Sequence, residues 1–518
     1  MFGGRYHKNE SAEQYATVCR NRHSRPRIGR KSARGRALSR SAPDPSSRLL
    51  LVVADGVRPD VLAQELDGGR TPAMAGLRAR GGLHTVTTSF PSVTGPAYVP
   101  FLMGRHAGSA GLPGLRWYDR ARALRLSPAN ARSYAGIDIW HVDYDIAPAM
   151  PTLLELARPS LSGMSMIGRG ASIGNVGRSL AWTVRAAIPH FRGDLSGWRR
   201  AEHAAIEAFF RVFRKTRPRF SVLAITSPDK LAHKFGSDSP QVRDSIADVD
   251  VSIAQAQAIA ADGGWLDTLR VWVVSDHGHA PVTQHDDLHG WLESRALRVL
   301  AHPHLYTRRA DVALMVGGNA MAHLYLEPAT RTRAWWPAHA ARWEATHDAL
   351  VARDPIDLAI VAMSADSLRV SHATRGSALI SRTPAHDPRN ARWDYDAQLG
   401  DPLQLGGSHR GLSDEDAWSL CSTSPYPDAL VQLHAVGTSP RAGDVMLSAA
   451  AGWDLRSRFE PVAHVSTHGA LLHDQMLVPL LLDAPVARQP QRTADVMPSG
   501  LDALGLPIPD GLDGRSFW

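Results

Sequence analysis

The stretch LLLVVADGVR, residues 49–58, decides the fold. Its first six residues are all apolar and show no polar alternation, as expected for a parallel strand that is covered on both faces. Asp55 and Gly56 follow at once and end the strand. Ligands of open α/β sheets collect at the carboxyl ends of the strands. We therefore expect Asp55 to lie at a functional edge of a sheet.

Two later segments have the same form. Residues 220–226 (FSVLAIT) lead into Ser-Pro-Asp229, and residues 269–274 (LRVWVV) lead into Ser-Asp276-His277. Helical patterns separate the strands, at residues 152–156, 201–214 and 241–261. This alternation predicts an α/β fold with a central, mostly parallel sheet flanked by helices.

The chain has 518 residues, which is long for one compact domain. A long excursion separates the third predicted strand from the last candidate ligand, His468. It contains further strand and helix patterns. We interpret it as a smaller α+β cap, inserted at about residues 312–385 into a larger domain that spans residues 48–518.

The basic character of the chain belongs to its first segment. Residues 1–48 carry 12 of the 58 Lys and Arg but 3 of the 50 Asp and Glu, so they account for the net charge of +8. The lack of apolar periodicity predicts a disordered leader and linker, residues 1–47. Such a segment is either simply solvated or suited to weak contacts with nucleic acid or anionic lipid. No ordinary signal peptide and no 18-residue apolar run are present, which predicts a cytoplasmic location without a transmembrane segment.

One hydroxyl and six metal-ligand side chains make up the candidate site. Thr94, the candidate nucleophile, lies in TTSFPSVTGPA, residues 87–97. The candidate ligands divide into one group of Asp229, His233 and His468 and another of Asp55, Asp276 and His277, with Thr94 on or near the second group. Asp229 and His233 share one face if a helix begins at that turn. Mixed carboxylate and imidazole ligation fits Zn²⁺, and less strictly manganese or iron.

Two cations would explain why a threonine can react. Its hydroxyl is a poor nucleophile at neutral pH, and metal binding lowers the pKa of an oxygen acid, from about 15.7 to about 7 for zinc-bound water. A second cation stabilises the leaving oxygen. The set therefore predicts attack of Thr94 on phosphorus, followed by hydrolysis of a threonyl intermediate. Each residue alone also has a structural explanation, such as a turn for Asp55 or a helix cap for Thr94.

The ordered motifs resemble the type I phosphodiesterase, or nucleotide pyrophosphatase/phosphodiesterase, family of the alkaline phosphatase superfamily. The resemblance rests on Asp55-Gly-Val-Arg, Phe90-Pro-Ser-Val-Thr94-Gly-Pro-Ala, Pro228-Asp229-Lys-Leu-Ala-His233, Ser275-Asp276-His277-Gly-His279 and Thr467-His468-Gly469. It implies an alkaline-phosphatase-like fold, two divalent metal ions and Thr94 as the nucleophile. Ser92 competes for this role, and the ten-residue interval from Thr94 to Gly104 favours Thr94.

The sequence departs from this pattern in the substrate region. Nucleotide-cleaving relatives often carry Phe-Pro-Asn after the nucleophile and a later Asn that holds a phosphate oxygen. Here Gly95-Pro-Ala follows Thr94, and residues 111–117 contain no Asn. Arg116 is the candidate substitute, because a guanidinium binds phosphate bidentately; a surface arginine is the alternative.

Two further histidines stand beside the main set. His279 is a candidate partner of a metal ligand, with a plain buried histidine as the alternative. His473 competes with His468 for the metal, and Gly469 favours His468 because it permits a close turn.

We predict a metal-dependent hydrolase that cleaves phosphodiester or pyrophosphate-type bonds in a small-molecule phosphate ester. A phosphomonoesterase or phosphonate hydrolase on the same site is the first alternative. A non-catalytic protein that binds anions, nucleic acid or a membrane surface is the alternative from another class. A sulfatase is disfavoured, because the Cys/Ser-x-Pro-x-Arg motif is absent.

Overall fold

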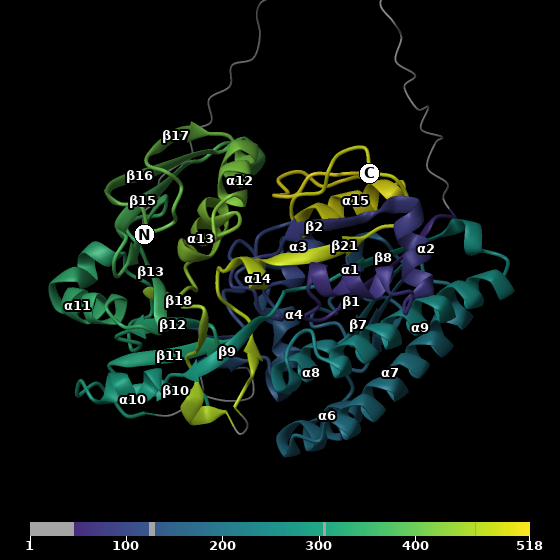
Figure 1. The fold of residues 1–518 in the computed structure, drawn as a ribbon, viewed down its shortest axis with the longest axis horizontal. Coiled ribbons are helices and arrows are strands. Elements are labelled where there is room, and N and C mark those ends of the chain that lie inside the picture. The colour runs from purple at the N-terminus through teal and green to yellow at the C-terminus, as the bar shows by residue number, and fades with distance from the viewer. Residues whose placement is uncertain (1–45, 124–129, 304–306, 461–462) are drawn as a thin grey trace, which may run out of the picture. The chain divides into compact units, whose positions relative to one another are not determined.

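Figure 1 shows the computed structural model, which describes residues 46–123, 130–303, 307–460 and 463–518. The chain divides into two units, Met1–Ala42 and Pro43–Trp518, and the second is described below. The predicted leader, residues 1–47, lies outside the described residues except for its last two. Within the described ranges, no helix is both long and apolar enough to cross a membrane.

A seven-stranded sheet forms the centre of the fold. Its order is β2-β21-β8-β1-β7-β5-β6, and the five strands from β8 to β6 are parallel. Strand β21 is antiparallel to both of its neighbours, β8 and β2, and β2 forms the edge on that side. The strands span Arg48–Ala54 (β1), Leu83–Thr87 (β2), Ser160–Gly163 (β5), Gly174–Val176 (β6), Phe220–Ile225 (β7), Leu269–Val274 (β8) and Leu477–Leu481 (β21). The predicted α/β class and mostly parallel sheet are confirmed.

The central strands are apolar throughout because both faces of the sheet are covered. Every residue of β7, and every residue of β1 after Arg48, is buried. Helix α9 contacts β1 and β8, and α7 contacts β5, β6 and β7. Helix α15 packs against Leu49 and Trp272 at Gly500. The helices around this sheet span Pro59–Asp67 (α1), Pro72–Gly81 (α2), Tyr98–Met103 (α3), Leu153–Leu156 (α5), Leu195–Thr216 (α7), Ser227–Phe235 (α8), Pro240–Asp262 (α9) and Val496–Ala503 (α15).

Local signals set the ends of the long helices. The Ser239 hydroxyl accepts a hydrogen bond from the Val242 amide, and Pro240 occupies the first turn of α9. The Asp194 carboxylate accepts from the Gly197 amide at the start of α7. The predicted helices at residues 201–214 and 241–261 therefore lie inside α7 and α9.

A second sheet of nine strands lies to the left of the first in Figure 1. Its order is β10-β11-β12-β18-β13-β14-β15-β16-β17. The strands span Val299–Ala301 (β10), Val312–Gly317 (β11), Met321–Leu326 (β12), Ile356–Ala362 (β13), Ser367–His372 (β14), Gly376–Thr383 (β15), Arg392–Gly400 (β16), His409–Leu412 (β17) and Val445–Ala449 (β18). The predicted insert, residues 312–385, supplies β11 to β15, and its independence as a unit stays a prediction.

The nine-stranded sheet has an apolar cluster of its own on each side. Helix α11 (Trp336–Val351) contacts β13 and brings Trp336 and Trp343 into one cluster. Helix α13 (Ala429–Gly437) contacts β13, β14 and β15 and brings Leu430 and Leu433 into the other. Both clusters are separate from the core of the seven-stranded sheet.

Smaller elements connect the two sheets. A three-stranded sheet has the order β19-β9-β20, and β3 pairs with β4. These strands span Arg116–Tyr118 (β3), Ala131–Ser133 (β4), Ala280–His285 (β9), Gly452–Asp454 (β19) and Ser466–Thr467 (β20). The remaining α-helices of the described chain span Val142–Asp145 (α4), Leu180–Arg192 (α6), Leu288–Glu293 (α10), Asp414–Ser422 (α12) and His473–Met476 (α14).

Candidate metal centre

The carboxyl ends of three neighbouring strands bring the predicted ligands together. Asp55 follows β1, Asp276 and His277 follow β8, and Asp229 lies in the first turn of α8, just after β7. The order β8-β1-β7 makes these strands parallel neighbours. Parallel strands end at the same edge of a sheet, so the carboxylates converge there.

The first group consists of Asp55, Asp276, His277 and Thr94. The Nε2 atom of His277 lies 3.4 Å from Oδ1 of Asp55 and 3.6 Å from Oδ2 of Asp276. The same nitrogen lies 3.1 Å from the hydroxyl oxygen of Thr94. The two carboxylates and the imidazole are buried, whereas Thr94 is half-buried. Thr94 is thus the partly exposed member of this group.

The carboxylates of this group fit a bound cation. Oδ1 of Asp55 and Oδ2 of Asp276 are buried and have no hydrogen-bond partner among the described residues. Burial raises the pKa of Asp55 well above its usual value, and the charges of Asp276 and Asp229 raise that pKa further. Buried like charges cost free energy unless a counter-charge is near. A divalent cation would remove that cost.

The second group converges on one oxygen of Asp229. Oδ1 of this carboxylate lies 3.3 Å from Nε2 of His233 and 3.5 Å from Nε2 of His468. A fourth side chain joins them, because Nε2 of His279 lies 3.0 Å from the same oxygen. Asp229 and His233 lie four residues apart on α8, and as predicted from this spacing their side chains lie on the same face of the helix.

Backbone contacts aim the imidazoles at this centre. Nδ1 of His233 lies 2.9 Å from the Ser466 carbonyl oxygen, and Nδ1 of His468 lies 2.9 Å from the Ser92 carbonyl oxygen. Nδ1 of His277 lies 3.0 Å from the Gly278 carbonyl oxygen. A ring whose Nδ1–H donates to a carbonyl keeps its Nε2 lone pair for a metal, an arrangement typical of metal-binding histidines.

The titration of His468, His279 and Asp229 agrees with this role, whereas His233 differs: burial would lower its pKa, but the Asp229 carboxylate raises it. Burial lowers the pKa of His468 well below its ordinary value, and His277 contributes to this effect. Burial also lowers the pKa of His279, to about 4. These imidazoles are therefore neutral at pH 7. Burial alone would raise the pKa of Asp229, but His233 and His279 hold it well below its usual range. A neutral imidazole and an ionised carboxylate are the forms that bind metals.

The loop that carries Thr94 distinguishes it from Ser92. The buried Ser92 hydroxyl donates to the Ala470 carbonyl and accepts from the Gly469 amide. The Thr94 hydroxyl instead faces His277. Of the two candidate hydroxyls, that of Thr94 lies beside the Asp/His groups, whereas that of Ser92 is bound to the backbone of residues 469 and 470.

Two other histidines complete this description. His473 has an exposed side chain and lies 3.4 Å from its neighbour Asp474, outside the cluster. His464 was not expected from the sequence, yet its ring centroid lies 4.2 Å from that of His233. The Asn319 side chain lies 3.1 Å from Nδ1 of His464. No regular spacing links Asn319, His464 and His233, so sequence patterns carry no signal for this contact.

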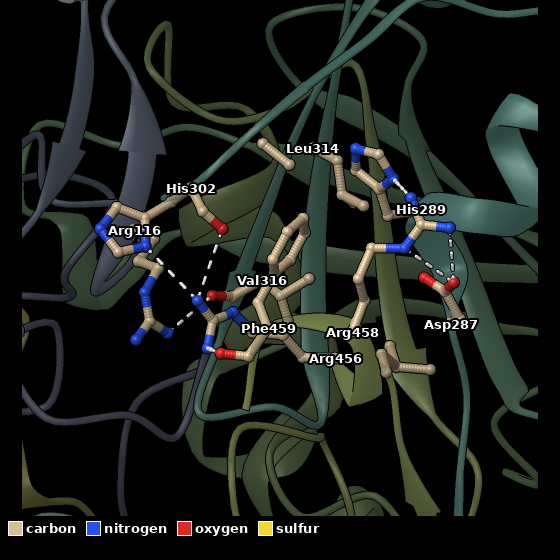
Figure 2. Close-up of a pocket in the computed structure, with 11 residues that line it drawn as sticks. Arg116, Asp287, His289, His302, Leu314, Val316, Arg456, Arg458 and Phe459 are labelled. Carbon is tan, nitrogen blue, oxygen red and sulfur yellow. Dashed lines mark hydrogen bonds and ion pairs between the residues drawn. The ribbon is translucent and has the colours of Figure 1, made fainter. Parts of the chain in front are cut away.

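Arg116 lines a pocket away from the predicted ligands (Figure 2). Its Nη1 donates to the Val316 carbonyl oxygen at 3.1 Å. The pocket lining includes His302 and Arg456, and it includes none of the seven residues predicted as metal ligands. The structure therefore brings those seven together and places Arg116 beside another group of basic side chains.

The sheet order and the buried Asp/His centre define the class: an α/β protein with a mostly parallel sheet and a cluster of candidate metal ligands at the carboxyl ends of its strands. The chain belongs to the type I phosphodiesterase / nucleotide pyrophosphatase family, whose model matches residues 49–471. Members of this family are phosphoric ester hydrolases. The family predicted from the motifs is confirmed.

Curated relatives match a part of the chain. Human ectonucleotide pyrophosphatase/phosphodiesterase family member 7 is 25% identical over 238 residues, which cover 46% of this chain and 48% of the relative. The mouse protein of the same name is 23% identical over 239 residues, which cover 46% and 51%. The chain spans about half the length of the curated relatives it matches.

Solved structures share the fold over nearly the whole chain. Phosphonoacetate hydrolase from Sinorhizobium meliloti 1021, in complex with phosphonoformate, has 15% identity and a TM-score of 0.51, covering 90% of this chain and 98% of that chain. Murine ectonucleotide pyrophosphatase/phosphodiesterase 5, an inactive threonine-to-alanine variant in complex with AMP, has 15% identity and a TM-score of 0.53, covering 91% and 98%. At these identities the likeness shows the fold alone.

Proposed function

We propose that the chain hydrolyses phosphodiester or pyrophosphate-type bonds of small-molecule phosphate esters, with Thr94 as the nucleophile and two divalent metal ions, most simply Zn²⁺. One observation carries the proposal. The Thr94 hydroxyl oxygen lies 3.1 Å from Nε2 of His277, beside the buried carboxylates of Asp55 and Asp276, each of which has one oxygen without a hydrogen-bond partner among the described residues. Metal-assisted attack on phosphorus requires a hydroxyl beside side chains that can hold a cation, and these carboxylates and this imidazole are such side chains.

The chain offers two sets of ligands for the ions. One ion would be held by Asp229, His233 and His468, and the other by Asp55, Asp276, His277 and Thr94. Carboxylate oxygen and imidazole nitrogen fit zinc. When bound, the ions supply the positive charge that lowers the pKa of the Thr94 hydroxyl and stabilises the leaving oxygen.

The reaction then follows from the position of Thr94. Its oxygen forms a bond to phosphorus, the bond to the leaving oxygen breaks, and the leaving group departs with a proton. Water next forms a bond to the same phosphorus, and the Thr94 oxygen is released and protonated. The Ser92 carbonyl holds His468 and the Gly278 carbonyl holds His277 throughout, so neither ring has to reorient.

Substitution of Thr94 tests the proposal. Thr94→Ala should lower kcat for bis(p-nitrophenyl) phosphate by at least about 10³-fold, because removal of a nucleophile leaves only binding and charge stabilisation. Metal analysis should find close to two ions per chain in the wild type. Ser92→Ala is the matched control on the same loop and should keep turnover well above that of Thr94→Ala. Equal turnover of Thr94→Ala and the wild type would refute the role of Thr94.

A phosphomonoesterase or phosphonate hydrolase remains the second candidate, because a phosphonoacetate hydrolase shares the fold. The comparison of bis(p-nitrophenyl) phosphate with p-nitrophenyl phosphate and phosphonoacetate separates the candidates. A kcat/KM that is highest for the diester supports the first proposal. A non-catalytic anion-binding protein predicts the opposite pattern of mutants: loss of function on deletion of residues 1–46 and no effect of Thr94→Ala.

Several predictions about the whole chain stand as proposals. We propose that residues 1–47 form a basic leader and that residues 48–518 form one phosphoesterase domain, with an insert at about residues 312–385. Limited proteolysis followed by mass spectrometry tests these boundaries. A cytoplasmic location and a weak anionic contact of the leader are tested by cell fractionation and by vesicle sedimentation with anionic lipid.

A further inference from the structure

A basic pocket lies between the end of β10, strand β11 and residues 455–459. Figure 2 shows Arg116, His302 and Arg456 grouped on one side, with Arg458, His289 and Asp287 on the other. The space between the lining atoms is about 290 Å³, including its open mouth. Because that volume counts open solvent, the cavity itself is small: about 10 Å³ is open to the centre of a water-sized group, which leaves room for one small group.

The two sides of this pocket differ in how their charges are compensated. Arg458 pairs with Asp287 at 2.9 Å and with Glu293 at 2.6 Å. The buried Arg456 pairs with Glu460. Arg116 has no carboxylate within 4.0 Å among the described residues, and its buried Nε has no hydrogen-bond partner there. Arg116 therefore lacks a direct ion pair, and the charge of Glu460 offsets its own only in part.

The surroundings of Arg116 make an anion favourable. Burial lowers the pKa of Arg116 to about 9, and the charge of Arg456 contributes. Burial, together with Arg116 and Arg456, also lowers the pKa of His302, to about 3, so this imidazole is neutral. Nη2 of Arg456 lies 3.4 Å from Nδ1 of His302. Arg116 and Arg456 repel each other, and Glu460 is the one carboxylate that offsets their two charges. A bound anion would reduce this repulsion.

Short stretches of chain link the pocket to the proposed centre. Arg116 donates to the carbonyl of Val316, and Gly318 follows two residues later, at most about 7 Å along the chain. A Cβ at Gly318 would lie 2.5 Å from the Val93 side chain and 2.9 Å from Nδ1 of His468. Gly318 therefore touches both the neighbour of Thr94 and a proposed ligand.

A second link leads from Arg456. The Asp454 carboxylate accepts from the Arg456 amide at 2.7 Å and from the Asn319 side chain at 3.2 Å. Asn319 in turn contacts His464, whose ring lies beside that of His233. Arg116 and Arg456, on the same side of the pocket, are thus each linked to residues that surround the metal centre.

We propose that Arg116, Arg456 and His302 form a subsite for a second anionic group, a carboxylate or a phosphate, on the substrate that Thr94 attacks. This inference rests on the proposed function and narrows its substrate class to phosphate esters with a further negative charge. The guanidinium of Arg116 binds the anion, Arg456 adds charge, and His302 supplies a neutral hydrogen-bonding edge. The phosphoryl group that reacts stays at the Asp/His centre.

Matched substrates test the subsite in the wild type. The substrates are pairs of p-nitrophenyl phosphodiesters that differ only at the end of the second alcohol. One member of each pair ends in a carboxylate and the other in the neutral methylamide. One pair has a spacer of two carbons and another a spacer of four. A third version ends in a phosphate. The charged form should have a kcat/KM at least about tenfold above that of the methylamide for one spacer, which corresponds to about 1.4 kcal/mol. Equal values across every pair would overturn the subsite.

Variants then assign the effect to Arg116. In Arg116→Gln the ratio of charged to neutral kcat/KM should fall toward one. Arg458→Gln removes the same charge from the opposite wall, where Asp287 and Glu293 already bind it, and should keep the wild-type ratio. Arg456→Gln provides a second variant if Arg116→Gln does not fold. A ratio that neither Arg116→Gln nor Arg456→Gln changes would also overturn the proposal.

Binding separates this inference from the proposed function. Titration calorimetry with 4-phosphonobutanoate and 6-phosphonohexanoate and with their neutral methylamides needs no turnover. At least about tenfold tighter binding of one acid, lost in Arg116→Gln, supports the subsite even in a protein that hydrolyses none of the diesters. Absent hydrolysis would then count against the proposed function, and equal binding of acids and amides would count against the subsite.

Discussion

The imidazole rings of His277 and His468 stack, with centroids 3.6 Å apart and planes 7° from parallel. Each ring belongs to a different Asp/His group, so this contact is the common wall of the two proposed metal sites. Two stacked imidazoles cannot both be protonated without strong repulsion, and the pKa of His468 is lowered accordingly by burial and by His277. A change in one group should therefore alter the other.

The first prediction concerns the buried carboxylates. Asp55→Asn should stabilise the metal-free protein by about 1–3 kcal/mol, because it removes one of two buried carboxylates whose charges repel each other. In zinc-saturated protein the same change should destabilise, because a ligand is lost. Urea unfolding, once with a chelator and once with excess Zn²⁺, measures the change in the free energy of unfolding under each condition.

Asp60→Asn is the control for this prediction. Asp60 is exposed and pairs with Arg58, so its substitution should change the free energy of unfolding by less than about 0.5 kcal/mol under both conditions. Equal destabilisation by Asp55→Asn with and without metal would show that Asp55 has only a structural role.

The second prediction concerns His279. Its Nε2 lies 3.0 Å from Oδ1 of Asp229, so the ring either orients that carboxylate or adds a ligand beside it. His279→Ala should weaken zinc binding by about 10–100-fold. Competition with a chromophoric chelator gives the affinity. His279→Gln should recover part of the loss, since its amide can donate to Asp229, whereas the exposed His473→Ala should bind zinc like the wild type.

The third prediction concerns pH and a histidine outside the metal centre. Burial lowers the pKa of His323 to about 4. Its Nε2 lies 2.9 Å from the Pro113 carbonyl oxygen, and its Nδ1 accepts from the Gly443 amide at 3.1 Å. Protonation of Nδ1 would break the second bond, so the folded chain keeps this ring neutral.

The direction of this pH effect follows from how the folded and unfolded chains bind a proton at His323. Between pH 6.5 and about 4 the unfolded chain binds a proton at His323 and the folded chain does not. The free energy of unfolding should therefore fall as pH drops through this window, by at most about 1.4 kcal/mol per pH unit from this group. Urea unfolding at pH 7 and pH 5 measures the change. His323→Gln should show a smaller change than the wild type, and an identical change would contradict the assignment.

Much of the fold could be predicted from local patterns. The apolar runs at residues 49–54, 220–226 and 269–274 became β1, β7 and β8, because continuous burial on both faces leaves no room for polar alternation. The strands β16, β17 and β18 were not anticipated. Their pairing joins segments such as β12 and β18, more than 100 residues apart, and local periodicity contains no such information.

The sequence by itself determined which residues can perform the chemistry. Thr94, three aspartates and three histidines are recognisable because strand ends and an i, i+4 spacing are local features. Only the tertiary structure decided where those side chains point. Thr94 meets His277 across 183 residues, and Ser92 turns its hydroxyl toward Ala470, 378 residues away. The direction of a side chain depends on the packing of segments that are distant in the sequence. For the same reason, only the tertiary structure shows that Arg116 lies among other basic groups and not beside the predicted ligands.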